Sequence, residues 1–370
     1  MPDSPSTNPD FSAPPFTGAP AARFEPLPAD GVLPEGFFST SNLPTYVHVD
    51  GRWLAPTRPR MDCVVVKRPG GLETIEPRRL RRGDLVAMGE AEDGTEGIVV
   101  HGEGFLGGGH GANEFRFMST EVSRERPVNY EELAMRVGEE KRRGGYLVWV
   151  VGPALVHSRA RADFEWFIRQ GYVQAVLAGN AVAVHDIEAS IYKTSLGITA
   201  SGEASTGGHG LHMRAINKVR AAGSIAKAVE QGIITDGIMY ACVVNKVPFV
   251  LTGSIRDDGP LPDVITDALE GQDAMRAQTK RATMAILIAT ALHAIATGNM
   301  LPAFVTEEDG SLRELATICV DSSEFVVSKL KDRGTHQAFG VVTNAQDFMH
   351  VLRFYVERWE QAQTPAPAVR

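Results

Sequence analysis

Several hydrogen-bonding side chains lie in and directly after one apolar run of the sequence. Asn180 lies within the run VQAVLAGNAVAV, His185 and Asp186 come directly after it, and Glu188 follows two residues later. Carboxylates beside a histidine raise its proton affinity, which suits proton transfer, and an amide both donates and accepts hydrogen bonds. A structural alternative is a helix that begins here with Asp186 as its cap. We predict that Asn180, His185 and Asp186 contribute to a site, and the cap stays open as the alternative.

A second cluster stands in the segment GSIRDDGPLPD. Ser254, Arg256, Asp257 and Asp258 precede Gly259 and a proline, a combination that favours a tight turn. Two adjacent carboxylates in such a turn can hold a cationic amine or a ribose. Because Asp-Gly-Pro is also ordinary turn chemistry, the sequence leaves the functional and the structural interpretation open.

The third cluster ends the apolar segment ATICVDSS with Asp321 and Ser322. An acid at the end of a strand can accept hydrogen bonds from both hydroxyls of a ribose, as in dinucleotide-binding sheets. Asp321 can also cap a helix over the following segment SEFVVSKLKDR, and the two roles are compatible.

Two further patterns are weaker. Gly102, Gly104 and Gly107 match the glycine spacing of a dinucleotide-binding loop, but the following GGHGANEF does not read as a helix, so we interpret it as a surface loop. His209 and His212 lie three residues apart without a third ligand at useful spacing, so we predict no metal site.

The elements that would position these clusters fall into two regions. From residue 23 to 125, short strands alternate with Pro, Gly and charged residues, which predicts a small β-rich domain. From residue 126 to 362, wholly apolar runs alternate with amphipathic segments, which predicts an α/β fold with a doubly wound, mostly parallel sheet. Such a sheet binds its ligand at the carboxyl ends of its strands. We expect disordered tails over residues 1–22 and 363–370.

Composition narrows the class of protein. The 370 residues carry a formal net charge of -8, which argues against binding to nucleic acid. The segment 282–306 lacks Asp, Glu, Lys and Arg, but its polar residues indicate a buried strand and a short helix rather than a membrane span. Cys63, Cys242 and Cys319 are too few and too scattered for a disulfide framework, so we expect a reducing, cytoplasmic location.

The order of longer motifs resembles one known family. AGNAVAVHDIE, GGHGLHMRAIN, VPFVLTGSIRDDGPLPDVI, LHAIATGNMLP and CVD resemble the motifs of the archaeal-type ornithine cyclodeaminases and of the C-terminal part of cyanobacterial arginine dihydrolases. The resemblance covers about residues 30–343. It implies an NAD-binding domain similar to that of deoxyhypusine synthase, in which a turn like IRDDG and an acid like Asp321 contact the dinucleotide. Many relatives begin with a further ferredoxin-like domain, which has no counterpart in this sequence.

The resemblance also implies an activity, namely conversion of L-ornithine to L-proline and ammonia by an NAD that is regenerated in each turnover, and a homo-oligomeric state. Another diamino acid or a polyamine as substrate, for example lysine giving pipecolate, stays open as an alternative, as does a non-catalytic NAD-binding module. We assign Asn180, Asp186, Ser254, Gly259, Asp321 and Ser322 to NAD, Asp257, Asp258 and His185 to the amine and its protons, and Asn42 and Arg256 to substrate contact.

Overall fold

The structure is a computed structural model that describes residues 9–102, 128–199, 201–203, 205, 208–257, 259–324, 326–327 and 338–363. The chain divides into two compact units. The first unit contains Met1–Ser119, Gly298–Leu315 and Leu330–Ala338, and the second contains Thr120–Thr297, Ala316–Lys329 and Phe339–Arg370. The predicted boundaries treat 126–362 as one continuous domain, whereas the chain returns to the first unit over Gly298–Leu315.

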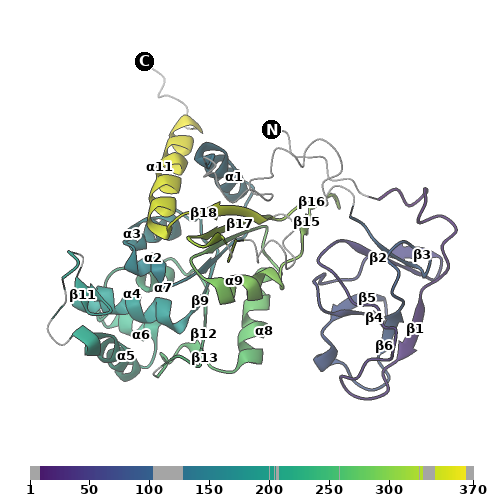
Figure 1. The fold of residues 1–370 in the computed structure, drawn as a ribbon, viewed down its shortest axis with the longest axis horizontal. Helices are drawn as coiled ribbons and strands as arrows, with labels where there is room; N and C mark the ends of the chain where they lie inside the picture. Colours follow the sequence, from purple (N-terminus) through teal and green to yellow (C-terminus); the bar gives the residue numbers. More distant parts are fainter. Residues whose placement is uncertain are drawn as a thin grey trace. The chain divides into compact units, whose positions relative to one another are not determined.

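A seven-stranded sheet forms the core of the second unit (Figure 1). The strands lie in the order β13-β12-β9-β8-β14-β17-β18, and the pairings from β13 across to β17 are parallel. Every residue of β8 and β14 is buried, as expected for central parallel strands with helices on both faces. The predicted α/β class with a doubly wound sheet is confirmed. The strands are β8 (Leu147–Val151), β9 (Ala175–Gly179), β12 (Phe249–Thr252), β13 (Val264–Ile265), β14 (Met284–Ile288), β17 (Ala316–Asp321) and β18 (Ala338–Val342).

The direction of winding changes between β8 and β14. β9 and β12 follow β8 on one side, and β14 and β17 lie on the other, which is the strand order of dinucleotide-binding sheets. Just past β8, the Gly152 N–H donates to the Ile288 carbonyl of β14 at 2.9 Å. A Cβ on Gly152 would overlap the Ala289 carbonyl oxygen, so glycine allows the two strand ends to approach closely. A ligand crevice is expected at this edge of the sheet.

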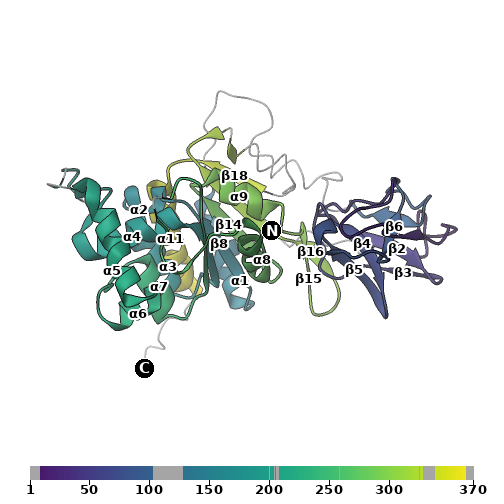
Figure 2. The same ribbon diagram turned by 90° about the horizontal axis from the view of Figure 1, so that it is seen from below.

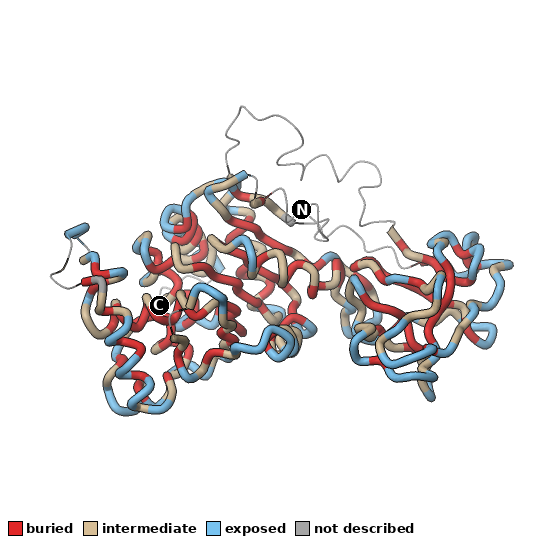
Figure 3. The backbone as a smooth tube through the Cα atoms, turned by 60° about the horizontal axis from the view of Figure 1, so that its bottom comes forward, coloured by how far each residue is buried: buried red, intermediate tan, exposed pale blue. Residues whose placement is uncertain are grey.

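Helices cover both faces of this sheet. Figure 2 shows α3, α7 and α11 on one side of the strands and α8 on the other, and the tube in Figure 3 is red along the enclosed strands. The helix α1 illustrates how local sequence sets an end: the Asn129 side chain accepts a hydrogen bond from the Glu132 N–H. The helices are α1 (Tyr130–Arg142), α2 (Ala154–His157), α3 (Arg161–Arg169), α4 (Asn180–Tyr192), α5 (Leu211–Ala222), α6 (Ile225–Glu230), α7 (Ile238–Val244), α8 (Ala268–Thr279), α9 (Ala291–Gly298) and α11 (Ala345–Gln363), with the 3-10 turn η2 (Gly208–Gly210) and the small hairpin of β10 (Thr194–Ser195) and β11 (Ile198–Thr199).

The first unit is β-rich, as predicted. It contains a four-stranded sheet in the order β1-β6-β4-β5, a three-stranded sheet β3-β2-β7 and the hairpin β15-β16. Its elements are β1 (Arg23–Pro26), β2 (Thr45–Val49), β3 (Arg52–Leu54), β4 (Val64–Arg68), β5 (Gly71–Ile75), η1 (Pro77–Arg79), β6 (Leu85–Met88), β7 (Ile98–Val100), β15 (Phe304–Thr306) and β16 (Leu312–Glu314).

The tail predicted over residues 1–22 is wrong for residues 9–22. Phe16 is buried, its ring packs against Tyr46 and Trp53, and its carbonyl accepts a hydrogen bond from Trp53 Nε1 at 3.1 Å. Burial of aromatic side chains offsets the entropy lost when this proline-rich segment is ordered. Residues 1–8 and 364–370 lie outside the described residues.

The segment 282–306, which lacks Asp, Glu, Lys and Arg, contains β14, α9 and β15. Within the described ranges, no helix combines the length and the apolar character needed to cross a membrane.

Candidate active site

The carboxyl edge of the large sheet collects polar side chains from several strands. Asn180 follows β9, Asp257 follows β12, His293 follows β14, and Asp321 ends β17. Since parallel strands end at the same edge, these residues share one rim of the second unit. β8 and β14 lie between β9 and β17 in the sheet, so Asp321 stands on the far side of the winding change from Asn180.

Asn180 connects two of the strand ends. It is the first residue of α4, it is buried, and its Oδ1 accepts a hydrogen bond from the Leu261 N–H at 3.1 Å. Leu261 closes the turn that begins at Ser254, so the amide of Asn180 fixes this turn against the end of β9.

In the turn after β12, Arg256 is exposed and Asp257 is partly exposed. The Asp257 carboxylate accepts a hydrogen bond from the Ser254 N–H at 2.7 Å, and the Ser254 hydroxyl accepts one from the Arg256 N–H at 3.2 Å. Gly259 has φ +101°, a left-handed value that favours glycine. Asp258 lies outside the described residues. The turn is therefore a preformed loop that holds one carboxylate at the rim.

Asp321 and Ser322 occupy the end of β17. Asp321 is partly buried and accepts a hydrogen bond from the Ser323 N–H at 2.8 Å, while Ser322 is exposed. Both side chains thus remain available at the rim.

His293 is a residue of this edge that the sequence-based assignments left out. Its Nε2 lies 2.7 Å from Thr252 Oγ1, at the end of β12. Burial lowers the pKa of His293 below its ordinary value, and the nearby Asp257 carboxylate opposes that shift. The only signal in the sequence was its place shortly after an apolar run, and a packed helical turn predicts the same pattern.

His185 belongs to a separate cluster on α4. Its ring lies 4.5 Å from that of His157, between centroids, and its Nδ1 lies 3.8 Å from a Glu188 oxygen. On the other side, His157 Nδ1 is 2.7 Å from Ser195 Oγ. Among the described contacts, none joins His185 to the Asp257 turn. The structure therefore does not bring together the two groups that we assigned to the same amine.

Glu188, next to this pair, is completely buried. It accepts hydrogen bonds from Thr194 Oγ1 at 2.9 Å, from the Gly197 N–H at 2.8 Å and from the Leu196 N–H at 3.1 Å. Burial by itself would raise the pKa of Glu188, but the His185 ring and these donors hold it below its ordinary value. Glu188 stabilises the β10-β11 hairpin.

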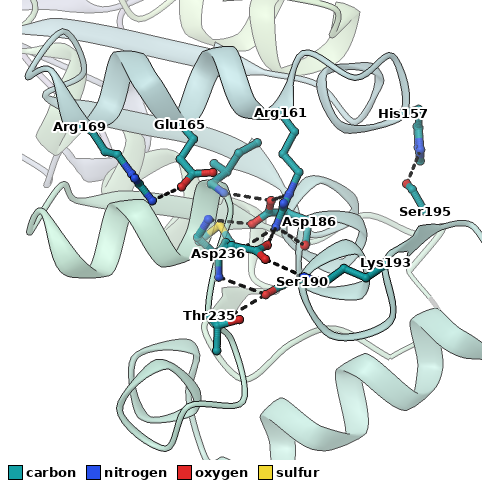
Figure 4. Close-up of polar contacts among 12 residues, drawn as sticks. His157, Arg161, Glu165, Arg169, Asp186, Ser190, Lys193, Ser195, Thr235 and Asp236 are labelled. Atoms are coloured by element: carbon teal, nitrogen blue, oxygen red, sulfur yellow. Dashed lines mark hydrogen bonds and ion pairs between the residues drawn. The ribbon is translucent and has the colours of Figure 1, made fainter. Parts of the chain in front are cut away.

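The structure corrects the role of Asp186. This residue has no exposed surface; Oδ1 accepts from Arg161 Nε at 2.6 Å and from the Ile238 N–H at 3.0 Å, and Oδ2 accepts from the Met239 N–H at 2.8 Å. Figure 4 shows this network, in which Arg161 also bonds to Asp236, and Asp236 to Lys193. Since both oxygens of Asp186 are used inside the protein, the residue joins α3, α4 and α7 and does not contact NAD as predicted.

Asn42 lies in the first unit. It is buried, its carbonyl accepts a hydrogen bond from the Ala303 N–H at 2.9 Å, and its Nδ2 has no hydrogen-bond partner among the described residues. A buried donor without a partner is costly, which is consistent with a ligand contact at this amide.

The strand order and the polar carboxyl edge define the second unit as a dinucleotide-binding α/β fold. Residues 131–352 match the family model "Arginine dihydrolase ArgZ-like, C-terminal, Rossmann fold", and residues 44–131 match "Arginine dihydrolase ArgZ-like, C-terminal, first region". The chain belongs to this family, which it shares with archaeal ornithine cyclodeaminases.

Three relatives illustrate the similarity. The ornithine cyclodeaminase of Methanopyrus kandleri is 47% identical over 336 residues, covering 89% of this chain and 77% of the relative. The crystal structure of a LOR/SDH protein from Methanococcus maripaludis is similar with a TM-score of 0.82 at 41% identity, covering 92% of this chain and 99% of that one. The ternary complex of AgrE with ornithine and NAD+ has a TM-score of 0.59 at 36% identity, covering 93% of this chain and 47% of AgrE.

Proposed function

We propose that this protein is an NAD-dependent ornithine cyclodeaminase, which converts L-ornithine to L-proline and ammonia. The observation that carries the proposal is the polar carboxyl edge of a sheet with dinucleotide-binding strand order. The name of the Methanopyrus relative and the ligands of AgrE supply the substrate and the cofactor.

The residues of the edge fit a dinucleotide. The N-cap residue of α4 is Gly179, which provides no side-chain cap, so the first N–H groups of the helix are available to an anionic group. Asp321 offers a carboxylate to ribose hydroxyls, with the Ser322 hydroxyl next to it in the sequence. Ser254 and Gly259 offer a small side chain and backbone groups in the turn after β12. Asn180 acts through the turn that it fixes. NAD held at this edge would supply reversible hydride transfer at the amino-acid carbon.

The substrate would bind where carboxylates meet this edge. Ornithine carries two ammonium groups and one carboxylate, so Asp257 and Asp258 are assigned to an ammonium group, and Arg256 and Asn42 to substrate contact. The protein must remove a proton from one amine and supply one to the departing amine, while it excludes water from the imine. The sequence-based assignment of His185 to these protons has no support from its described contacts, which are with His157 and Glu188.

Incubation of the purified protein with ornithine, with and without added NAD, tests the activity by proline and ammonia measurement. Proline and ammonia in equal amounts support the proposal. NAD binding without ammonia release would indicate a non-catalytic module. Lysine is supplied in parallel, because one methylene changes discrimination by only about 1 to 3 kcal/mol.

Asp321→Ala tests the cofactor assignment. Loss of a charge-assisted hydrogen bond of about 1.5 to 3 kcal/mol should weaken NAD binding roughly 10- to 150-fold, without loss of folding. Asp347→Ala, an exposed aspartate in the first turn of α11, is the matched control. Unchanged NAD affinity in Asp321→Ala would remove Asp321 from the site.

A cytoplasmic homo-oligomer completes the proposal. All three cysteines are buried and unpaired, which is compatible with a reducing compartment. Light scattering of the full chain tests the oligomeric state, and a monomer at working concentration would contradict it.

A further inference from the structure

One partly buried imidazole of the carboxyl edge, that of His293, has no role in the proposed function. His293 lies in the first turn of α9, directly after β14, where the winding of the sheet changes. Its neighbours come from two other strands, so three segments that are distant in the sequence meet at this ring.

Two contacts fix the ring in place. Nε2 lies 2.7 Å from Thr252 Oγ1, and Cε1 lies 2.9 Å from the position that a Cβ on Gly179 would occupy. Gly179 has φ -89°, so its backbone conformation does not require glycine. What requires glycine here is the space that the imidazole occupies.

The second ring nitrogen is free to act. Within the described part of the chain, Nδ1 of His293 has no hydrogen-bond partner, whereas Nε2 is engaged by Thr252. Among the described charged residues near the ring, Asp257, in the turn after β12, affects the pKa of His293. Gly179 from β9 and Thr252 from β12 are uncharged. Burial keeps the pKa of His293 low, so the ring is neutral near pH 7.

We propose that His293 is a catalytic residue of this site, in which Nε2–H donates to Thr252 Oγ1 and Nδ1 exchanges a proton with the substrate's amine. In the first transfer, an N–H bond of the ammonium group breaks and an N–H bond to Nδ1 forms. In the second, the same proton passes from Nδ1 to the departing nitrogen, so the ring ends neutral and no redox partner is needed. This inference rests on the proposed function and specifies which residue moves the proton.

His293→Gln tests the proton transfer, because the amide can still bond to Thr252 but cannot carry a proton at neutral pH. We expect kcat to fall roughly 100-fold or more, with the affinity for NAD unchanged. The acidic limb of the wild-type pH profile of kcat, where Nδ1 becomes protonated, should disappear. His350→Gln, whose side chain is 76% exposed on α11, should retain wild-type kcat.

Gly179→Ala tests the geometry without touching a functional group. The added methyl group must displace the ring, so we expect kcat to fall roughly 10-fold. Gly210→Ala is the matched control, because Gly210 also precedes a helix with a negative φ, and a Cβ there would have no neighbour within 4 Å.

NMR of the full chain with labelled histidine supplies a readout that does not depend on turnover. The His293 ring should stay neutral below pH 6.5 in the wild type and in Gly210→Ala, and its titration midpoint should move upward in Gly179→Ala. The NMR spectrum also shows whether the variants are folded.

The outcomes separate the two proposals. If the wild type forms no proline, the proposed function fails. If the wild type forms proline and His293→Gln keeps more than about one third of its kcat with the acidic limb intact, the role of His293 fails while the function stands. A wild-type His293 that titrates like an exposed histidine would also overturn the role.

Discussion

Two polar clusters of the second unit differ in how far their hydrogen bonds are satisfied inside the protein. Around Asp186, a guanidinium and two backbone N–H groups occupy a carboxylate that has no exposed surface. Along the carboxyl edge, the carboxylates of Asp257 and Asp321 each accept one described hydrogen bond, and both residues stay partly exposed. In the first cluster the Asp186 carboxylate is fully hydrogen-bonded within the protein and joins three helices. In the second, the carboxylates can still accept hydrogen bonds from a ligand. Acidic residues that all follow or end apolar runs therefore have different roles, and the number of hydrogen bonds that each carboxylate accepts inside the protein distinguishes them.

The largest effect should come from opening the saturated cluster. Asp186→Asn replaces a fully buried carboxylate by a neutral amide and leaves Arg161 with Asp236 as its ion-pair partner. We expect this to lower the free energy of unfolding by about 3 to 5 kcal/mol. Urea denaturation measures the loss. Asp347→Asn, in the same unit but exposed at the start of α11, should cost less than about 1 kcal/mol. Equal losses in both variants would contradict the structural role of Asp186.

An Asp→Asn substitution at the carboxyl edge should reduce activity strongly and stability only slightly. Asp257→Asn should reduce turnover roughly 100-fold, about 2.7 kcal/mol in the barrier, and change the free energy of unfolding by less than about 1 kcal/mol. Steady-state kinetics and urea denaturation of one preparation give both values. An Asp257→Asn protein that is destabilised but fully active would reverse the comparison.

A smaller effect concerns pH. Burial and the neighbouring His185 lower the pKa of His157 below its ordinary 6.5, although Glu188 opposes the shift. Between the folded pKa and 6.5 the unfolded chain binds more protons, so stability falls as the pH drops through this window. His157→Gln should therefore flatten the loss of stability between pH 7 and 5, as thermal melts at several pH values would show. A slope identical to that of the wild type would exclude His157 as a source.

The smallest effect is expected at the rim of the saturated cluster. The Lys193 side chain is 68% exposed, and its ammonium group lies 2.7 Å from Asp236. Solvent screens such a pair, so Lys193→Gln should cost between 0 and about 1 kcal/mol in urea denaturation. A loss of stability comparable to that of Asp186→Asn would show that the exposed Lys193–Asp236 pair contributes as much as the buried Asp186 contacts.

The apolar runs predicted six of the seven strands of the large sheet, all except β13, but they did not predict where β9 ends. The run over residues 173–184 contains β9 and continues into α4, because NAVAV is as apolar as the strand before it. Apolar character alone does not separate a buried strand from a buried helical turn. The helix start that we held open as the alternative is present, but the helix begins at Asn180, and Asp186 lies inside it.

The sequence by itself determined the class of fold and the strand ends that carry Asn180, Asp257 and Asp321, because wholly apolar runs separated by amphipathic segments require a parallel sheet covered on both faces. Only the tertiary structure decided that the Asp186 carboxylate is paired with Arg161, and that His293 contacts Thr252, which is 41 residues away in the sequence. Burial and hydrogen-bond saturation depend on which distant segments pack together, and the spacing of residues along one chain does not contain that information.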